Sequence, residues 1–192
     1  VVPVNPMNRA EELKHYITDP QARVAITTAD LAVELAAASD GLPSGQGLSH
    51  LFVTSYTDAF DPAVGGEAAP PDAWMGWLTA AHALPALDGG EVLRWEAALA
   101  CTSPAPAHVV GACDLAILPY TSGTTGLPKG CMHLHRSIMH NAIASALCHS
   151  GSSENLALAV LPVSPITGMV LVTHTNALTP SPLVLMPRTD RR

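Results

Sequence analysis

Apolar and polar stretches alternate along the first sixty residues in a way that predicts strands and helices in turn. Short apolar runs bounded by turn residues predict strands at 1–6, 22–28 and 48–56, and the strand at 22–28 is expected to be buried. Helical spacing of apolar residues predicts helices at 8–19 and 29–39. Strands and helices in this order are typical of a parallel sheet covered by helices.

The two predicted helices have recognisable ends and faces. Asn8 is expected to cap the first helix, and Gly41 is expected to close the second. Leu13, Tyr16 and Ile17 fall on one face of the first helix, which predicts that this face packs on the sheet.

The rest of the chain has a less regular middle and a regular final part. Residues 61–113 are rich in proline, glycine and alanine and predict an irregular connection, with a surface loop at 61–73 and a short helical run at 74–86. Further strands are predicted at 115–122, 130–135, 154–164 and 182–188, with helices at 136–149 and 167–178. We therefore divide the chain into segments 1–60, 61–113 and 114–192. The predicted fold class is α/β, with a layered, mostly parallel sheet flanked by helices.

Composition supports a folded domain and excludes some partners. The chain has 192 residues, of which 48% are hydrophobic and 13% charged, which excludes disorder and leaves apolar surface for a partner. The net charge of −7 has no compensating basic stretch, so nucleic acid and anionic membranes are excluded as general partners. No run of 18 apolar residues predicts a membrane span. Four cysteines without paired spacing indicate reduced thiols and a cytoplasmic protein.

The run YTSGTTGLPKG, residues 120–130, has the composition of a site for a polyphosphate. Its three glycines let backbone N–H groups approach an anion, its hydroxyls donate further hydrogen bonds, and Lys129 adds a positive charge. It is not a Walker A loop, because Pro128 separates Leu127 from Lys129. The competing interpretation is a flexible hairpin loop with an exposed lysine.

This run resembles the phosphate-binding signature of the adenylate-forming superfamily, which includes AMP-forming acyl-CoA synthetases, luciferases and nonribosomal-peptide adenylation domains. Residues 1–28 are similar to the early strand-helix-strand segment of that family. CMHLHRSIMHN at 131–141 resembles the continuation found in acyl-CoA synthetases, and LPVSPITGMV at 161–170 followed by LVLMPR at 183–188 resembles the next landmark. The similarity covers nearly the whole chain in the right order.

The resemblance implies a fatty acyl-CoA synthetase, an AMP-forming ligase that works in two half-steps. A carboxylate attacks the α-phosphate of Mg-ATP to give an acyl-adenylate and pyrophosphate, and the thiol of CoA then displaces AMP. ATP, Mg, CoA and a carboxylic acid are therefore the implied substrates, and no catalytic residue is assigned to this chain. The residues implied to hold the β- and γ-phosphates are Thr121, Ser122, Gly123, Thr124, Thr125, Gly126 and Lys129.

Departures from the family pattern limit what the resemblance implies. Ser164 and Pro165 stand where acyl-CoA synthetases usually have an aromatic-histidine pair, and the aromatic residue expected near Thr189 is missing. The acyl chain length is therefore not predicted. The family continues beyond the position of Arg192 with adenine-binding, ribose-binding and Mg-binding segments and a C-terminal subdomain. We expect this chain to be a fragment of the N-terminal AMP-binding domain that is inactive alone.

Two alternatives stay open. Cys131, His133 and His135 would share a strand face and, with His140 or Cys148, could ligate zinc; their spacing is loose for a tetrahedral site, and we predict no metal. The alternative function is a non-catalytic α/β module that binds nucleotide phosphates or forms a homo-oligomer through exposed apolar edges. Acyl-dependent release of pyrophosphate distinguishes this module from the ligase.

Overall fold

The computed structural model describes residues 1–58, 71–121, 126–149, 152–162 and 166–185. The chain forms two compact units. Pro6–Pro106 makes up the first, called here the inserted unit. Val1–Asn5 and Ala107–Arg192 together make up the second, called the outer unit.

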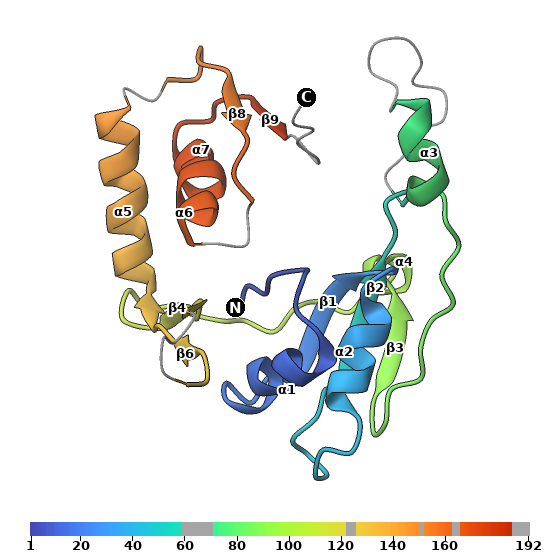
Figure 1. Cartoon of the computed structure of the whole chain (residues 1–192). Coiled ribbons are helices and arrows are strands. Elements are labelled where there is room, and N and C mark those ends of the chain that lie inside the picture. The colour runs from blue at the N-terminus through green and yellow to red at the C-terminus, as the bar shows by residue number, and fades with distance from the viewer. Residues whose placement is uncertain (59–70, 122–125, 150–151, 163–165, 186–192) are drawn as a thin grey trace. The chain divides into compact units, whose positions relative to one another are not determined.

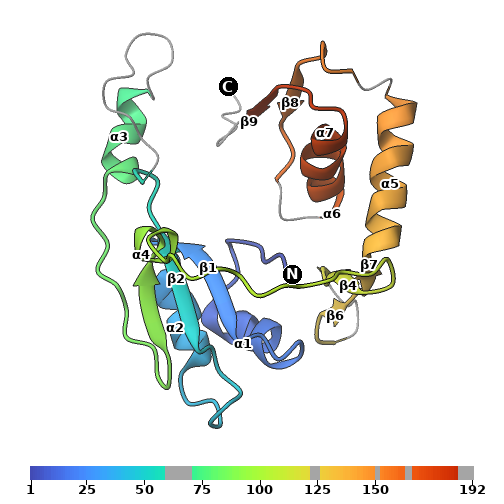
Figure 2. The same cartoon turned by 180° about the vertical axis from the view of Figure 1, so that it is seen from behind.

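The inserted unit is built on a three-stranded parallel sheet. Its strands β1 (Val24–Thr28), β2 (His50–Thr54) and β3 (Glu91–Arg94) lie in the order β1-β2-β3. Helices α1 (Ala10–Thr18) and α2 (Ala32–Ser39) lie together on one face of the sheet (Figures 1 and 2). Parallel strands with crossover helices confirm the predicted α/β class.

Strand β3 is absent from the sequence-based prediction, which assigned 61–113 to an irregular connection. His50 pairs with Glu91 and Val53 with Arg94, so β3 extends the sheet beyond β2. Two short helices flank it, α3 (Asp72–Leu78) and α4 (Trp95–Leu99). The strand has four residues with a charged one at each end. Pairing with β2 rather than an apolar pattern specifies it.

Within the described residues of this unit, α1 and α2 cover one face of the sheet (Figure 1) and β1 is partly exposed, which corrects the prediction of a buried strand at 22–28. Leu51 and Val53 are 0% and 1% exposed, whereas Val24 and Ile26 are 53% and 62% exposed. Alternate residues of a strand point to opposite faces. Because α1 and α2 lie on the same face, the apolar side chains of β1 on the other face stay exposed.

The ends of α1 and α2 agree only in part with those predicted from the sequence. Helix α1 begins at Ala10, and its N-cap is Arg9 rather than the predicted Asn8. The Arg9 backbone N–H donates to Glu12 Oε2 at 3.0 Å. Gly41, with φ +66°, follows the end of α2 as predicted. Of the apolar face predicted for α1, Leu13 and Ile17 are buried and Tyr16 is half-buried.

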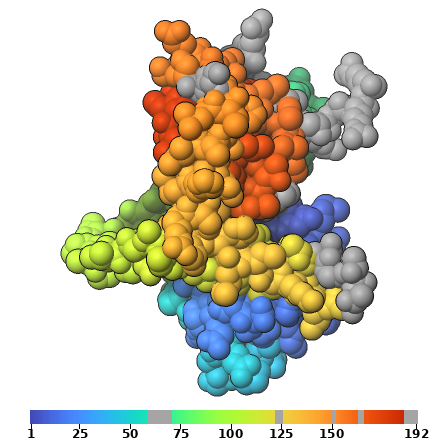
Figure 3. Space-filling model, turned by 90° about the vertical axis from the view of Figure 1, so that its left-hand side faces the viewer, coloured from blue at the N-terminus to red at the C-terminus, as the bar shows by residue number. Residues whose placement is uncertain are grey.

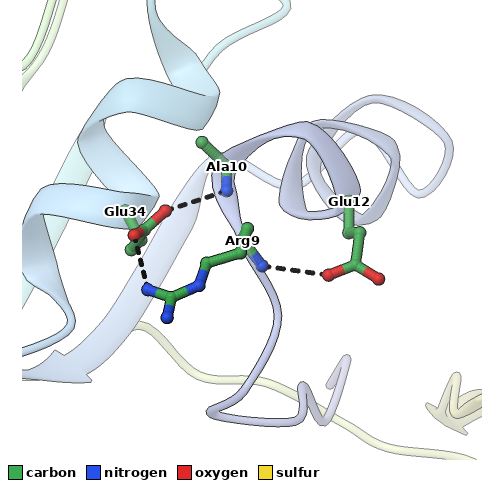
Figure 4. A network of polar contacts seen from close by, with 4 residues as sticks. All are labelled: Arg9, Ala10, Glu12 and Glu34. Atoms are coloured by element: carbon green, nitrogen blue, oxygen red, sulfur yellow. Dashed lines mark hydrogen bonds and ion pairs between the residues drawn. The ribbon is translucent and has the colours of Figure 1, made fainter.

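Glu34 connects the two helices at their N-terminal ends (Figure 4). Its carboxylate accepts hydrogen bonds from Arg9 Nη1 at 2.9 Å and from the Ala10 backbone N–H at 3.0 Å. These two bonds, that from Arg9 first, hold the pKa of Glu34 below its usual 4.5. The Arg9 side chain is exposed, so solvent screens the attraction between the two charges. The hydrogen bonds of Glu34 therefore contribute more to joining the helices than the charge attraction does.

The outer unit contains short strands and a group of helices. Strand β4 (Leu115–Ile117) pairs antiparallel with β7 (His133–Leu134), and β8 (Ala157–Ala159) pairs parallel with β9 (Leu183–Leu185). The helices are α5 (His135–Cys148), α6 (Ile166–Gly168), the π-helix η2 (Met169–His174) and α7 (Thr175–Leu178). No helix in the described part of the chain has the length and apolar character needed to cross a bilayer.

The core of the outer unit joins β4, α5 and η2. Ile117, Ile138 and Val170 pack together, each less than a tenth exposed. The helical spacing within 136–149 predicts one apolar face made of Ile138, Ala142, Ile143 and Ala146. In α5, Ile138 and Ala142 are buried, whereas Ile143 is 48% exposed. Figure 3 views the molecule from the side on which α5 lies, coloured orange. The core holds β4 against α5.

The N-terminal residue pairs with β4 across 115 positions of sequence. The Val1 nitrogen donates to the Ala116 carbonyl at 2.9 Å, and the Leu118 N–H donates to the Val1 carbonyl at 2.8 Å. This pattern is that of a parallel ladder around Ile117. A strand was predicted over 1–6; the structure gives this pairing at Val1 and no regular strand over those residues.

Candidate functional site

The glycine- and threonine-rich run begins and ends in a two-stranded hairpin. Strands β5 (Tyr120–Thr121) and β6 (Lys129–Gly130) pair antiparallel, with Tyr120 opposite Gly130 and Thr121 opposite Lys129. The Cys131 N–H donates to the Pro119 carbonyl at 2.8 Å and closes the base of the hairpin. Residues eight positions apart in sequence are thereby held side by side.

The two faces of this hairpin differ in character. Thr121 and Lys129 are exposed, and Tyr120 and Gly130 are half-buried. Thr121 Oγ1 also donates a long hydrogen bond, 3.5 Å, to the Lys129 carbonyl. Since paired residues share a face, one face of the hairpin presents a hydroxyl and an ammonium group to solvent.

Lys129 has its charge available for a ligand. Among the described residues, no carboxylate lies within ion-pair distance of the Lys129 ammonium. An ammonium group beside a hydroxyl can donate hydrogen bonds to phosphate oxygens. The exposed face can therefore attract and orient an anion.

The hairpin is anchored to the core of the outer unit. It follows β4 directly, and β4 carries the buried Ile117. Pro119, between β4 and β5, is buried as well. On the far side, β7 leads into α5, whose Ile138 packs on Ile117. Packed elements therefore fix both ends of the loop.

The structure describes some of the predicted phosphate-binding residues. Thr121 and Lys129 are brought together as a cross-strand pair, and Gly126 lies between them with nothing within 4 Å of where its Cβ would be. Ser122, Gly123, Thr124 and Thr125 lie outside the described residues, as do Ser164 and Pro165. The assignment of these residues to a phosphate site remains a prediction.

The possible zinc ligands do not gather in one place. Among the residues that the structure describes, no three His, Cys, Asp or Glu side chains could hold a metal ion. Cys131, His133 and His135 belong to this described part, as do His140 and Cys148. Within this part of the chain the structure thus brings together no set of protein ligands for a metal ion.

Gly130 has a role that sequence reasoning missed. It was counted among the loop glycines but not assigned to the site. A Cβ on Gly130 would lie 3.1 Å from Leu118 Cγ and Cδ1 and 3.2 Å from Tyr120 Cζ. A glycine opposite an aromatic residue on a paired strand indicates such packing. The sequence alone does not show this signal, because it depends on the register of the hairpin.

Comparisons with known proteins agree on one family. A family model described as AMP-binding enzyme matches residues 1–192. The long-chain-fatty-acid–CoA ligase of Salmonella typhimurium is 28% identical over 177 residues, which is 89% of this chain and 30% of that ligase. The 4-hydroxybutyrate–CoA ligase 2 of Metallosphaera sedula is 52% identical over 46 residues, or 24% of this chain and 8% of that one.

A solved structure shows the same fold. A putative long-chain-fatty-acid CoA ligase from Rhodopseudomonas palustris superposes with a TM-score of 0.68 at 17% identity, covering 98% of this chain and 38% of that one. The chain therefore spans less than half the length of each of these proteins.

Proposed function

The chain belongs to the AMP-binding enzyme family over residues 1–192, and on that premise we propose that its hairpin binds the β- and γ-phosphates of ATP. The proposed binding residues are Thr121, Ser122, Gly123, Thr124, Thr125, Gly126 and Lys129. The supporting observation is the cross-strand pair of Thr121 and Lys129, two exposed residues that place a hydroxyl and a positive charge on the same face of the hairpin.

These residues act by position and charge. In the proposed reaction a carboxylate oxygen bonds to the α-phosphorus of ATP, and the bond from that phosphorus to the bridging oxygen of pyrophosphate breaks. Negative charge grows on the departing pyrophosphate, and Lys129 and the loop N–H groups stabilise it. They transfer no proton in this step.

We propose the whole reaction only for a protein of the full length of these relatives. The acyl-adenylate is attacked at its carbonyl carbon by the thiol of CoA, and AMP leaves. A fatty acid is the proposed acid, since the Salmonella relative is named a long-chain-fatty-acid–CoA ligase. The residues proposed here contact the phosphates, and the described part of the chain contains no ligand set for Mg. A cytoplasmic location is part of the same proposal.

The 192 residues alone are expected to bind phosphates without forming acyl-adenylate, since they span 30% of the Salmonella ligase. Calorimetric titration of Mg-ATP and of pyrophosphate into the chain and into Lys129→Ala tests the binding site. Binding that weakens with the substitution supports the proposal. Absence of binding to the unsubstituted chain, or equal binding to both proteins, contradicts it.

The second candidate function, self-association without catalysis, has one observation in its favour. Val24 and Ile26 are apolar and more than half exposed, on the face of the sheet opposite α1 and α2 (Figure 1). Sedimentation velocity of the chain and of the double variant Val24→Thr, Ile26→Thr tests it. A dimer that dissociates on substitution favours this function, whereas a monomer at all concentrations rules it out.

A further inference from the structure

We propose that Gly130 is a positioning residue of the phosphate hairpin: its missing side chain makes room for Leu118 and Tyr120, and their packing sets the place of Lys129. The inference rests on the proposed function of the hairpin. It concerns a residue outside the group proposed to contact the phosphates.

The pairing pattern makes Tyr120 and Gly130 one of the closer pairs across the hairpin. The Cys131 N–H bonds to the Pro119 carbonyl at 2.8 Å, which makes that pair a hydrogen-bonded one. Antiparallel pairs alternate, so the next pair, Tyr120 and Gly130, is a narrow one without mutual hydrogen bonds. Narrow pairs bring the two Cα atoms to about 4.5 Å and their side chains into contact.

Leu118 and Tyr120 occupy the space that a side chain at position 130 would need. Residues two apart in an extended segment point the same way, so both side chains lie on the face of Gly130. A Cβ there would meet Leu118 Cγ and Cδ1 at 3.1 Å and Tyr120 Cζ at 3.2 Å, closer than ordinary van der Waals contact. The aromatic ring of Tyr120 therefore lies next to Gly130 on this face.

The packing on this face determines what happens on the other. Lys129 precedes Gly130 directly, and its side chain points to the opposite, exposed face beside Thr121. If a side chain at 130 pushes Leu118 and Tyr120 away, strand β6 moves with it and carries Lys129 out of position. Misplacement of a binding group by about 1 Å is enough to weaken its action strongly.

The test compares Gly130→Ala with the double variant Leu118→Ala, Gly130→Ala, in which Cγ and Cδ1 of residue 118 are gone. The single variant Leu118→Ala completes the cycle. Gly76→Ala is the matched control, because a Cβ at Gly76 meets nothing within 4 Å. Calorimetric titration with pyrophosphate gives the affinity and the stoichiometry, and hydrogen exchange of the Cys131 amide reports on the base of the hairpin.

We expect Gly130→Ala to lower pyrophosphate affinity about tenfold, because the overpacked hairpin displaces Lys129, with stoichiometry unchanged. Exchange of the Cys131 amide should accelerate, and the double variant should recover both readouts relative to Leu118→Ala. A general loss of folding would lower the stoichiometry instead. Unchanged affinity in Gly130→Ala, or a double variant no better than Gly130→Ala, overturns the inference.

A wild-type chain that binds no pyrophosphate would refute the proposed function, and the exchange measurement would then decide the role of Gly130 by itself. Faster exchange of the Cys131 amide in Gly130→Ala, recovered in the double variant and absent in Gly76→Ala, keeps Gly130 as the residue that positions β6. Equal exchange in all four proteins overturns it.

Discussion

The carboxylate of Glu34, in the first turn of α2, accepts the backbone N–H of Ala10, the first residue of α1, at 3.0 Å. One helix thus satisfies a free N–H group at the start of another. The Arg9 guanidinium bonds to the same carboxylate at 2.9 Å, and together the two donors lower the pKa of Glu34.

Glu34→Gln is expected to lower the melting temperature at pH 7, because the amide keeps the shape of the side chain but loses its charge. A carboxyl group whose pKa is depressed in the folded state stabilises the protein above its unfolded pKa, near 4.5. That contribution disappears as the pH falls through the folded pKa. The difference in melting temperature between the two proteins should therefore be constant above pH 4.5 and shrink below it, as measured by circular dichroism.

Glu11→Gln is the control for Glu34→Gln. Glu11 lies in the first turn of α1, as Glu34 does in that of α2, so both carboxylates share the helix-dipole effect, but within the described residues the Glu11 carboxylate has no ion pair. It should change the melting temperature less. A difference for Glu34→Gln that persists unchanged at acidic pH contradicts the role assigned to the charge.

Lys129→Ala is expected to weaken pyrophosphate binding by about tenfold to a hundredfold, the range for a hydrogen bond to a charged group. Salt screens such a contact, so the affinity of the unsubstituted chain should fall as salt is raised. Lys129→Arg should keep this salt dependence, and Lys129→Ala should reduce it. Lys14→Ala, an exposed lysine of α1, should change neither quantity. A salt dependence equal in all four proteins rules out a phosphate contact by Lys129.

Gly90→Ala is expected to destabilise the inserted unit by about 1–3 kcal/mol or more, the cost of overpacking. Its Cβ would lie 2.6 Å from the Leu48 carbonyl oxygen and 2.9 Å from that of Ser49, and backbone atoms cannot move aside cheaply. Gly76→Ala, in α3, should instead stabilise by about 0.5–1 kcal/mol, the difference in helix propensity. Urea denaturation followed by fluorescence measures both, and a mild effect at Gly90 would show that β3 is placed differently.

Ile117→Ala is expected to destabilise the outer unit by about 2–5 kcal/mol, since it removes a side chain that is 4% exposed from the contact with Ile138 and Val170. The chain's three tryptophans, Trp74, Trp77 and Trp95, all lie in the inserted unit. Tryptophan fluorescence should therefore keep its transition while far-ultraviolet circular dichroism shows an earlier one. Ile117→Val should give a smaller effect of the same kind. Coincident shifts of both signals would mean that the two units unfold together.

Local sequence predicts the elements with strong patterns and clear ends. Helix α2 and its closing residue Gly41 were expected, as was α5 with Ile138 and Ala142 inward. In these segments the helical spacing and the glycine terminator act within a few residues. For the candidate site, the sequence pattern predicts the loop at 120–130 and Lys129.

Features that depend on distant residues are not visible in local patterns. The start of α1 is set by Glu12 and by Glu34 from another helix, so Asn8 is not its cap. Strand β3 exists through pairing with β2. The exposed face of β1 depends on which side of the sheet both helices occupy. The contact of Gly130 with Leu118 and Tyr120 appears only when the hairpin is paired.

The pairing of Val1 with β4 bears on the order in which the two units can form their contacts during synthesis. Its two hydrogen bonds require Ala116 and Leu118, so Val1 can pair with β4 only after the inserted unit between them has been made. The inserted unit is complete once Pro106 is made, and its contacts are available earlier. Because domains generally fold as units during synthesis, we expect the inserted unit to be able to fold before the strand that leads to the phosphate hairpin gains its parallel neighbour.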